Sequence, residues 1–229
     1  MIKDNYRTIL NNVETASAQS PFEKKAKLIA VSKMHSAGEI MEVYEEGQRD
    51  FGENKVQELT DKAGQLPDDI RWHMIGHLQT NKVKNIIDRV YMIHSVDSEK
   101  LAVVISREAQ KHALVMPVLI EVNIGNEPSK SGVKSEELED IVRKISVLPN
   151  IKVQGLMCIP PASADAEKTR KYFAALRNLS IDINQLNIDN IQMNVLSMGM
   201  SDDYAEAISE GSDYVRVGTG IFGMRDYGK

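Results

Sequence analysis

The stretch Leu28-Ile29-Ala30-Val31-Ser32-Lys33 decides the fold. A short apolar run that contains β-branched residues and leads into a stretch of helical character is typical of a buried parallel strand. Seven further runs of this kind follow along the chain, and the segments between them have helical periodicity. The predicted strands cover residues 28–33, 50–54, 71–76, 91–96, 116–123, 153–158, 192–198 and 214–218.

Strands that alternate with helices pair in parallel, and eight of them close into a barrel with the helices outside. No linker rich in Gly, Pro or Ser interrupts the series, and 229 residues suffice for one barrel. We therefore predict a single α/β domain over residues 1–229, a (β/α)8 TIM barrel. An extra amphipathic N-terminal helix should end near Ser20-Pro21 and pack across the first strand. The asparagine-rich segment 178–194 is expected to be a surface connection.

The net charge, the cysteine count and the lengths of the apolar stretches exclude several classes of protein. A net charge of -5 argues against a surface built for nucleic acid. The single cysteine, Cys158, excludes an intramolecular disulfide and fits a reducing compartment. The sequence has no apolar stretch of membrane-spanning length and no apolar core of a signal peptide at its start. We expect a cytoplasmic protein with neither a membrane nor a nucleic-acid partner.

Lys33, at the end of the first predicted strand, is the first candidate for chemistry. Lysine is seldom surrounded by apolar residues, and partial burial favours the neutral amine that attacks carbonyl compounds. Lys33 is therefore a candidate Schiff-base lysine. The alternative is a strand-end lysine whose ammonium reaches solvent past the apolar surface.

Two turns in the C-terminal quarter predict a phosphate site. Ser201 is expected to be the N-cap of a helix whose first turn holds Asp202 and Asp203. Gly218 and Thr219 follow the last predicted strand, where the backbone can approach a ligand closely. The loops after strands seven and eight of such barrels commonly hold phosphate. The alternative is an ordinary cap followed by a turn.

Arg216 and Asn54 could contact the same ligand. Counting by two along the last strand places Arg216 on the face opposite Val215 and Val217, so it should point into the barrel. There it could reach the ring nitrogen of a heterocycle or form a structural salt bridge. Asn54, at the end of the second strand, could face the ligand or cap the next helix.

Other polar residues are weaker candidates. His73 and His77 lie four apart, but the segment is predicted to be strand and lacks the glutamate of a zinc motif, so we expect no metal site. His77 should line the mouth of the barrel, and Cys158 should be a small core residue. Lys130 is expected to be a solvated charge, or else a residue that helps to receive or release an aldehyde ligand.

Several segments together resemble the pyridoxal 5'-phosphate homeostasis proteins (the YggS/PROSC family), and the resemblance covers nearly the whole chain. They are Ala30-Val31-Ser32-Lys33, Phe51-Gly52-Glu53-Asn54-Lys55, Trp72-His73-Met74-Ile75-Gly76-His77-Leu78-Gln79-Thr80-Asn81-Lys82, Gly155-Leu156-Met157, Leu196-Ser197-Met198-Gly199-Met200-Ser201 and Val215-Arg216-Val217-Gly218-Thr219-Gly220-Ile221-Phe222-Gly223. The resemblance implies a monomeric or weakly associating barrel similar to the N-terminal domain of alanine racemase.

The resemblance also implies a cofactor, pyridoxal 5'-phosphate (PLP), and a role for each site residue. It implies Lys33 as the Schiff-base lysine, Arg216 at the pyridine nitrogen and Asn54 near the ring. The phosphate would be held by Ser201, Gly218 and Thr219, and Met200 would be a further cofactor-binding residue.

A PLP-binding protein that contributes to vitamin B6, amino-acid and keto-acid homeostasis, rather than an enzyme, is the function that the resemblance implies. Its expected partners are PLP, other B6 vitamers and PLP-dependent apo-enzymes. The alternative is a small PLP-dependent racemase or lyase that uses Lys33 as its base. A racemase of this fold needs a second base from a separate β domain, for which one barrel of 229 residues leaves no room. A third option is a regulator whose partner reads the loaded state.

Overall fold

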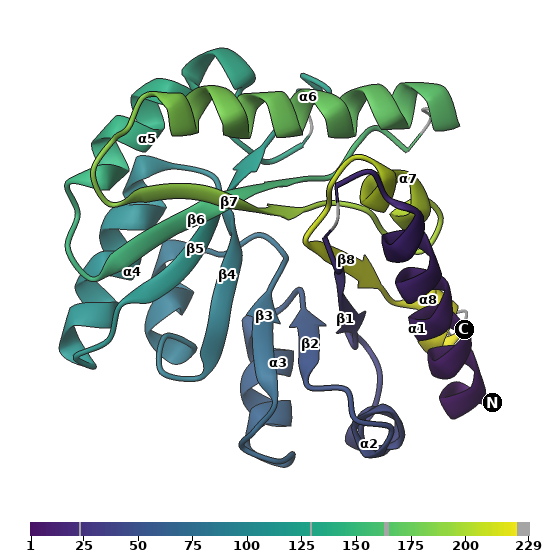
Figure 1. Ribbon diagram of the computed structural model, residues 1–229. Helices are drawn as coiled ribbons and strands as arrows, with labels where there is room; N and C mark the ends of the chain where they lie inside the picture. Colours follow the sequence, from purple (N-terminus) through teal and green to yellow (C-terminus); the bar gives the residue numbers. More distant parts are fainter. Residues whose placement is uncertain (23, 129, 163–164, 224–229) are drawn as a thin grey trace.

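Eight parallel strands form a closed barrel in chain order (Figure 1). The computed structural model describes residues 1–22, 24–128, 130–162 and 165–223. The strands are β1 Lys27–Val31, β2 Asp50–Glu53, β3 Arg71–Met74, β4 Val90–Val96, β5 Met116–Val122, β6 Ile151–Cys158, β7 Ile191–Ser197 and β8 Tyr214–Val217. The predicted TIM barrel is confirmed, and every predicted strand lies within two residues of an observed one at both ends.

Helices cover the outside of the barrel (Figure 1). They are α1 Ile2–Gln19, α2 Ala37–Glu45, α3 Val56–Ala63, α4 Glu99–Lys111, α5 Leu138–Ser146, α6 Ala166–Gln185, α7 Tyr204–Ser209 and α8 Thr219–Phe222, with short 3₁₀ turns at Thr80–Asn85 and Ser135–Glu137. The predicted N-terminal helix is confirmed as α1. It packs against α7, α8 and α2 and also contacts β1, where it covers the junction between the last and the first strand.

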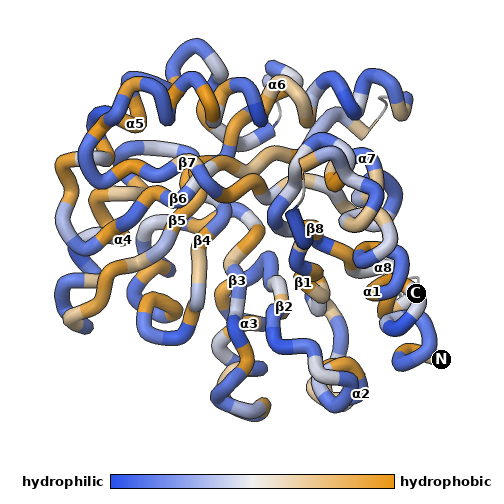
Figure 2. Tube along the Cα trace, viewed as in Figure 1, coloured by the Kyte–Doolittle hydropathy of each residue, from blue (hydrophilic) through white to orange (hydrophobic). Residues whose placement is uncertain are grey.

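The prediction for segment 178–194 is wrong in its first half, because α6 continues to Gln185. The helix persists because Phe173, Leu176 and Ile183 recur at helical spacing and are buried. Figure 2 shows the corresponding alternation of hydrophobic and hydrophilic residues along α6. The connection itself is a short turn before β7 that contains Asn187 and Asn190, both with positive φ.

The barrel has two cores. The larger lies between the strands and the helices and includes Val215 and Val217. The smaller lies inside the barrel and consists of Ile29, Met92, Leu119, Met157 and Tyr214. Tyr214 in the inner core and the valines in the outer one confirm the alternation predicted for β8, and Arg216 shares the inward face with Tyr214.

None of the helices in the described part of the chain is long and apolar enough to cross a membrane.

Candidate functional site

One pocket gathers all seven residues predicted to bind a cofactor. It has a volume of about 200 Å³ and lies at the carboxyl ends of the strands, mainly β1, β2, β7 and β8. This is the face on which barrels of this type build their sites. Its lining comprises Lys33, Asn54, Met200, Ser201, Arg216, Gly218 and Thr219, together with Val31, Ile75, Ile159 and Asp202.

Lys33 stands where the chain leaves the sheet. Ser32 is fully buried, and its N–H still donates to the Gly52 carbonyl oxygen of β2 at 3.0 Å. Met34 then adopts the left-handed conformation with φ 66°, which turns the chain away from the barrel. Lys33 is thus half-buried between a fixed strand end and a tight turn, with its side chain at the pocket.

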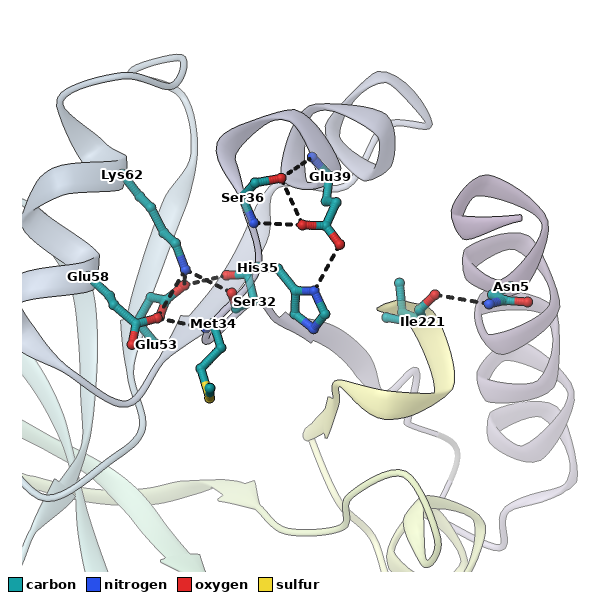
Figure 3. Close-up of polar contacts among 10 residues, drawn as sticks. All are labelled: Asn5, Ser32, Met34, His35, Ser36, Glu39, Glu53, Glu58, Lys62 and Ile221. Atoms are coloured by element: carbon teal, nitrogen blue, oxygen red, sulfur yellow. Dashed lines mark hydrogen bonds and ion pairs between the residues drawn. The ribbon is translucent and has the colours of Figure 1, made fainter. Parts of the chain in front are cut away.

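Lys62 on α3 and its partner Glu58 hold the backbone of Ser32 and Met34, the two neighbours of Lys33 in the chain; Figure 3 shows these contacts. The Lys62 Nζ donates to the Ser32 carbonyl oxygen and to Glu53 Oε1, each at 2.8 Å. The Ser32 hydroxyl donates to the same Glu53 oxygen at 2.7 Å. Glu58 lies 3.3 Å from the Lys62 ammonium and accepts the Met34 N–H at 2.7 Å. Burial raises the pKa of Glu53, against the opposing effect of Lys62.

The loop after β1 also contacts α8 near the C-terminal end of the described chain. The His35 ring stacks on Phe222 with ring centroids 4.6 Å apart, and its Nδ1 lies 3.1 Å from Glu39 on α2. Figure 3 also shows the Asn5 side chain of α1, which donates to the Ile221 carbonyl oxygen at 3.1 Å. The first and last βα units of the barrel are therefore joined next to the pocket.

The prediction that Ser201 caps a helix is wrong. The helix α7 begins at Tyr204, and its N-cap is Asp203. The Asp203 carboxylate accepts the Met200 N–H at 2.5 Å and so closes the turn that contains Ser201. Burial raises the pKa of Asp203, although this hydrogen bond opposes the shift. The Ser201 hydroxyl instead faces the other predicted turn, 3.5 Å from the Gly220 nitrogen.

Gly218 ends β8 at a point of close approach to β1. A Cβ at this position would lie 3.2 Å from the Val31 carbonyl oxygen and 3.3 Å from the Val31 Cβ. Gly218 is the N-cap of α8, and Thr219 is exposed at the rim of the pocket. The glycine lets the backbone of this turn, with its N–H groups, lie directly against the pocket wall.

Arg216 is buried and is held by neutral partners. Its Nη1 donates to the Ser197 hydroxyl at 2.7 Å and its Nη2 to the Cys158 carbonyl oxygen at 2.9 Å. Across the described ranges of the chain, no carboxylate lies within ion-pair distance of it, so the structural salt bridge is not found there. Burial lowers the pKa of the guanidinium. Cys158 is buried, as predicted, and burial raises the pKa of its thiol to about 12.

Asn54 does not cap the following helix, since the N-cap of α3 is Lys55. Its backbone packs against Gly76 at the end of β3. A Cβ on Gly76 would lie 2.5 Å from the Asn54 carbonyl oxygen and 2.7 Å from its Cα, so only glycine fits. Asn54 therefore belongs to the wall between this pocket and a neighbouring one.

The neighbouring pocket has a volume of about 300 Å³ and is lined by His77, Lys130 and Glu121. His77 is exposed at the mouth, as predicted, and its Nδ1 lies 3.1 Å from Asp97. Lys130 is not simply a solvated charge: its ammonium donates to the Pro160 carbonyl oxygen at 2.9 Å and pairs with Glu127.

Glu121 on β5 also lines this pocket and was not among the predicted site residues. It is 9% exposed, and burial, followed by the nearby charge of Asp97, raises its pKa to about 7. Its position could have been predicted from the alternation of side chains, because Glu121 shares with Leu119 the inward face of an otherwise apolar strand. Lys62 could not have been found in this way, because its contacts depend on how α3 packs.

Comparison with known proteins places the chain in a family. The family model "Alanine racemase, N-terminal domain" matches residues 5–226. A pyridoxal phosphate homeostasis protein of Aquifex aeolicus is 45% identical over 206 residues, which cover 90% of each chain. Another, from Pseudomonas aeruginosa, is 39% identical over 216 residues, 94% of this chain and 91% of that protein. This chain belongs to the pyridoxal phosphate homeostasis protein family.

Solved structures agree with this assignment. PipY of Synechococcus elongatus, a member of the family solved with PLP bound, superposes with a TM-score of 0.86 at 33% identity over 97% of this chain and 100% of that one. Its PLP-free structure gives a TM-score of 0.88 at 34% identity. Alanine racemase of Corynebacterium glutamicum, at 19% identity and a TM-score of 0.74, shares the fold; this chain covers 60% of it.

Proposed function

We propose that this protein binds PLP in the pocket at Lys33, holds it reversibly and passes it on to PLP-dependent apo-enzymes. In doing so it would contribute to vitamin B6, amino-acid and keto-acid homeostasis. The observation that carries the proposal is that a lysine amine, a guanidinium and a glycine turn line one small pocket. The PLP-bound structure of the relative PipY supports it.

The residues present fit this cofactor. When bound, PLP supplies an aldehyde that a primary amine can hold covalently and a pyridine ring that can withdraw electrons. Lys33 provides the amine, and Arg216 provides donors for a ring nitrogen. The close-packed turn at Gly218, with the hydroxyls of Ser201 and Thr219, provides hydrogen-bond donors suited to a phosphate.

Lys33 suits the role of a reversible anchor. The backbone on both sides of it is fixed by Lys62, Glu53 and Glu58, so its amine starts from a defined position. Lys33 itself is half-buried and lines the pocket, so a ligand that enters the pocket can reach it. A lysine with a fixed backbone at an open pocket favours capture and release of an aldehyde over its permanent burial.

Arg216 favours storage over catalysis. A guanidinium remains charged, can only donate hydrogen bonds, and so disfavours protonation of a ring nitrogen beside it. An unprotonated ring withdraws electrons less strongly, which weakens the chemistry that most amino-acid enzymes draw from PLP. Both hydrogen-bond partners of Arg216 are neutral, and the residue lines the pocket.

Reductive trapping tests the anchor. The protein is incubated with PLP, reduced with borohydride and digested, and the modified lysine is identified by mass spectrometry. We expect the label on Lys33 and its loss in Lys33→Ala, whereas Lys130→Ala, which alters the neighbouring pocket, keeps the label. A label spread over surface lysines in the wild type would contradict the proposal.

Transfer is tested by mixing the loaded protein with an apo-enzyme that depends on PLP. Activation should be faster than with the same concentration of free PLP in the presence of a scavenging amine. A vitamer without an aldehyde, such as pyridoxine phosphate, should not be trapped by borohydride. Equal activation rates with and without the carrier would remove the transfer step from the proposal.

A second candidate function, a small PLP-dependent racemase or lyase, is favoured by one observation. Glu121 places a carboxyl with a pKa of about 7 in the neighbouring pocket, which shares Asn54 with the first. Such a group can donate and accept protons near neutral pH. Exchange of the α-proton of amino acids in deuterated water, abolished by Lys33→Ala and slowed by Glu121→Gln, would establish this function. No exchange across a broad panel of amino acids would exclude it.

A further inference from the structure

A chain of hydrogen bonds runs through the interior of the barrel from Arg216 to Asp50. The Arg216 guanidinium donates to Ser197 Oγ at 2.7 Å, and the same oxygen lies 2.9 Å from His94 Nδ1. His94 Nε2 lies 2.9 Å from His73 Nδ1, and His73 Nε2 lies 2.9 Å from Asp50 Oδ1. The chain thus crosses strands β8, β7, β4, β3 and β2.

All the linking side chains are removed from solvent. His73, His94 and Ser197 are each 0% exposed, Arg216 is 4% exposed and Asp50 is 6% exposed. Buried polar groups must find partners within the protein, and here every link is made. Asp50 also accepts from Arg71 Nε at 2.8 Å and Nη2 at 2.6 Å, and Arg71 reaches solvent.

The two ends of the chain fix the direction of every hydrogen bond. Arg216 can only donate, and an ionised Asp50 can only accept. A neutral His73 must therefore carry its proton on Nε2 and accept at Nδ1, so His94 must also carry its proton on Nε2. The Ser197 hydroxyl then donates to His94 Nδ1 while it accepts from Arg216. Only one arrangement of the protons satisfies all four contacts with neutral histidines.

The surroundings keep both histidines neutral. Burial lowers the pKa of His73, although Asp50 opposes the shift, and burial lowers the pKa of His94 well below its usual value. Burial by itself would raise the pKa of Asp50, but hydrogen bonds from Arg71 and His73 lower it. The chain therefore has one anion at one end, one cation at the other and neutral groups between them.

We propose that Ser197, His94, His73 and Asp50 are positioning residues, which orient the Arg216 guanidinium through this one-directional chain and so determine how firmly the nitrogen end of PLP is held. The proposal rests on the proposed function, since it takes PLP as the ligand. The anion of this hydrogen-bond chain, Asp50, lies four hydrogen bonds away from Arg216. A carboxylate in direct contact would instead occupy the donors of Arg216 and bring negative charge to the ring.

The first test needs no ligand. In protein with ¹⁵N-labelled histidine, NMR should show His73 and His94 as neutral rings protonated on Nε2, and neither should titrate between about pH 5 and pH 8, where an ordinary histidine does. Histidine-to-glutamine variants of each residue would assign the signals. A ring protonated on Nδ1, or one that titrates near its usual pKa, would overturn the proposed chain.

The second test asks whether the chain acts through Arg216. Ser197→Ala should raise the PLP dissociation constant about tenfold, or about 1.4 kcal/mol, because Arg216 loses its hydroxyl partner and the chain is broken. Ser197→Thr, which keeps the hydroxyl, should restore most of the affinity. Ser106→Ala should have no effect: it removes another buried serine hydroxyl, which donates to the Pro149 carbonyl oxygen away from the site.

A double-mutant cycle separates positioning from a general structural role. In an Arg216→Gln background, Ser197→Ala should cause no further loss of affinity, since there is no guanidinium left to orient. A loss of the same size in both backgrounds, or wild-type affinity in Ser197→Ala, would overturn the proposal. A wild type that binds no PLP would overturn the proposed function itself, and the histidine NMR would still decide whether the chain exists.

Discussion

Lys62 and Arg216 are two buried cations near the same pocket, and they are held in opposite ways. Lys62 lies outside the barrel wall, within 3.3 Å of two carboxylates. Arg216 lies inside the barrel and contacts a hydroxyl and a carbonyl oxygen. The anion on its hydrogen-bond chain, Asp50, is four hydrogen bonds away.

The difference follows from what each cation does. Lys62 fixes backbone, so direct carboxylate partners are an advantage: they offset the cost of removing its charge from water. Arg216 faces a pocket, and direct neutralisation would use up the charge and the donors that a ligand needs. A buried cation that contacts only neutral groups is therefore a better indicator of a ligand site than a buried ion pair.

The largest expected effect comes from breaking the direct pair. Lys62→Met should lower the free energy of unfolding by about 3–5 kcal/mol at neutral pH, because it leaves the Glu53 carboxylate buried without its cation. Urea denaturation measures the loss, with the exposed Lys55→Met as the control. The deficit should shrink as the pH falls, since protonation of Glu53 removes the buried charge. A deficit equal to that of Lys55→Met would contradict this role for Lys62.

The next effect concerns Glu121, a buried carboxyl that has no cation in direct contact among the described residues. Its pKa in the folded protein, about 7, lies above the ordinary value of 4.5, so the folded state binds the proton more tightly. Its contribution to stability is full below about pH 4.5 and is lost as the pH rises to about 7. The loss is on the order of 3 kcal/mol for a shift of this size.

Glu121→Gln should remove this pH dependence. The difference in the free energy of unfolding between variant and wild type, measured by urea denaturation at several pH values, should grow in favour of the variant across that window. Asp97, His77 and Arg216 contribute the charges that act on Glu121 and are unchanged in the variant. A difference that does not change with pH would show that the carboxyl ionises as an ordinary surface group does.

The smallest effect is expected at the far end of the histidine chain. Asp50→Asn can still accept a hydrogen bond from His73, but it loses the charge that pairs with Arg71. We expect a loss of about 2 kcal/mol in the free energy of unfolding at neutral pH, the scale of a hydrogen bond to a charged group.

Lowering the pH removes the interaction between Asp50 and Arg71 in the wild type as well. Because the pKa of Asp50 is lowered in the folded state, its stabilisation is present above about pH 4 and is lost as the pH falls through the folded-state pKa. The two proteins should therefore converge in acid. Asp69→Asn, which removes the exposed partner of Arg49, should cost less. Equal stability of Asp50→Asn and the wild type at pH 7 would argue against an ionised Asp50.

The parts of the fold that follow from local pattern could be predicted from sequence. The alternation in β8 is sufficient to place Arg216 inside the barrel, because side chains alternate along any strand. The N-cap at Ser201 could not be decided in this way. Serine and aspartate are both common N-cap residues, and only the structure shows that the Asp203 carboxylate accepts the Met200 N–H while the Ser201 hydroxyl lies against the Gly220 nitrogen of the other turn.

The hydrogen-bond chain through the two histidines could not be predicted from sequence, because it depends on closure of the barrel. His73 and His94 lie 21 residues apart, which suggests neighbouring strands in a chain of regular βα units. Their contact, however, depends on the register of β3 against β4, and this register shifts within the pair. The link from His94 to Ser197 spans 103 residues and exists only because the sheet closes on itself.

The junction between β1 and β8, described above as the place where α1 covers the barrel, determines the order in which the site can form. Lys27 to Ala30 pair with Tyr214 to Val217, strands separated by almost the whole chain. During synthesis Lys33 emerges early, whereas Arg216 and the Gly218 turn emerge near the end. A growing chain can therefore carry the reactive amine long before the rest of its pocket exists, and closure of the barrel is the step that completes the site.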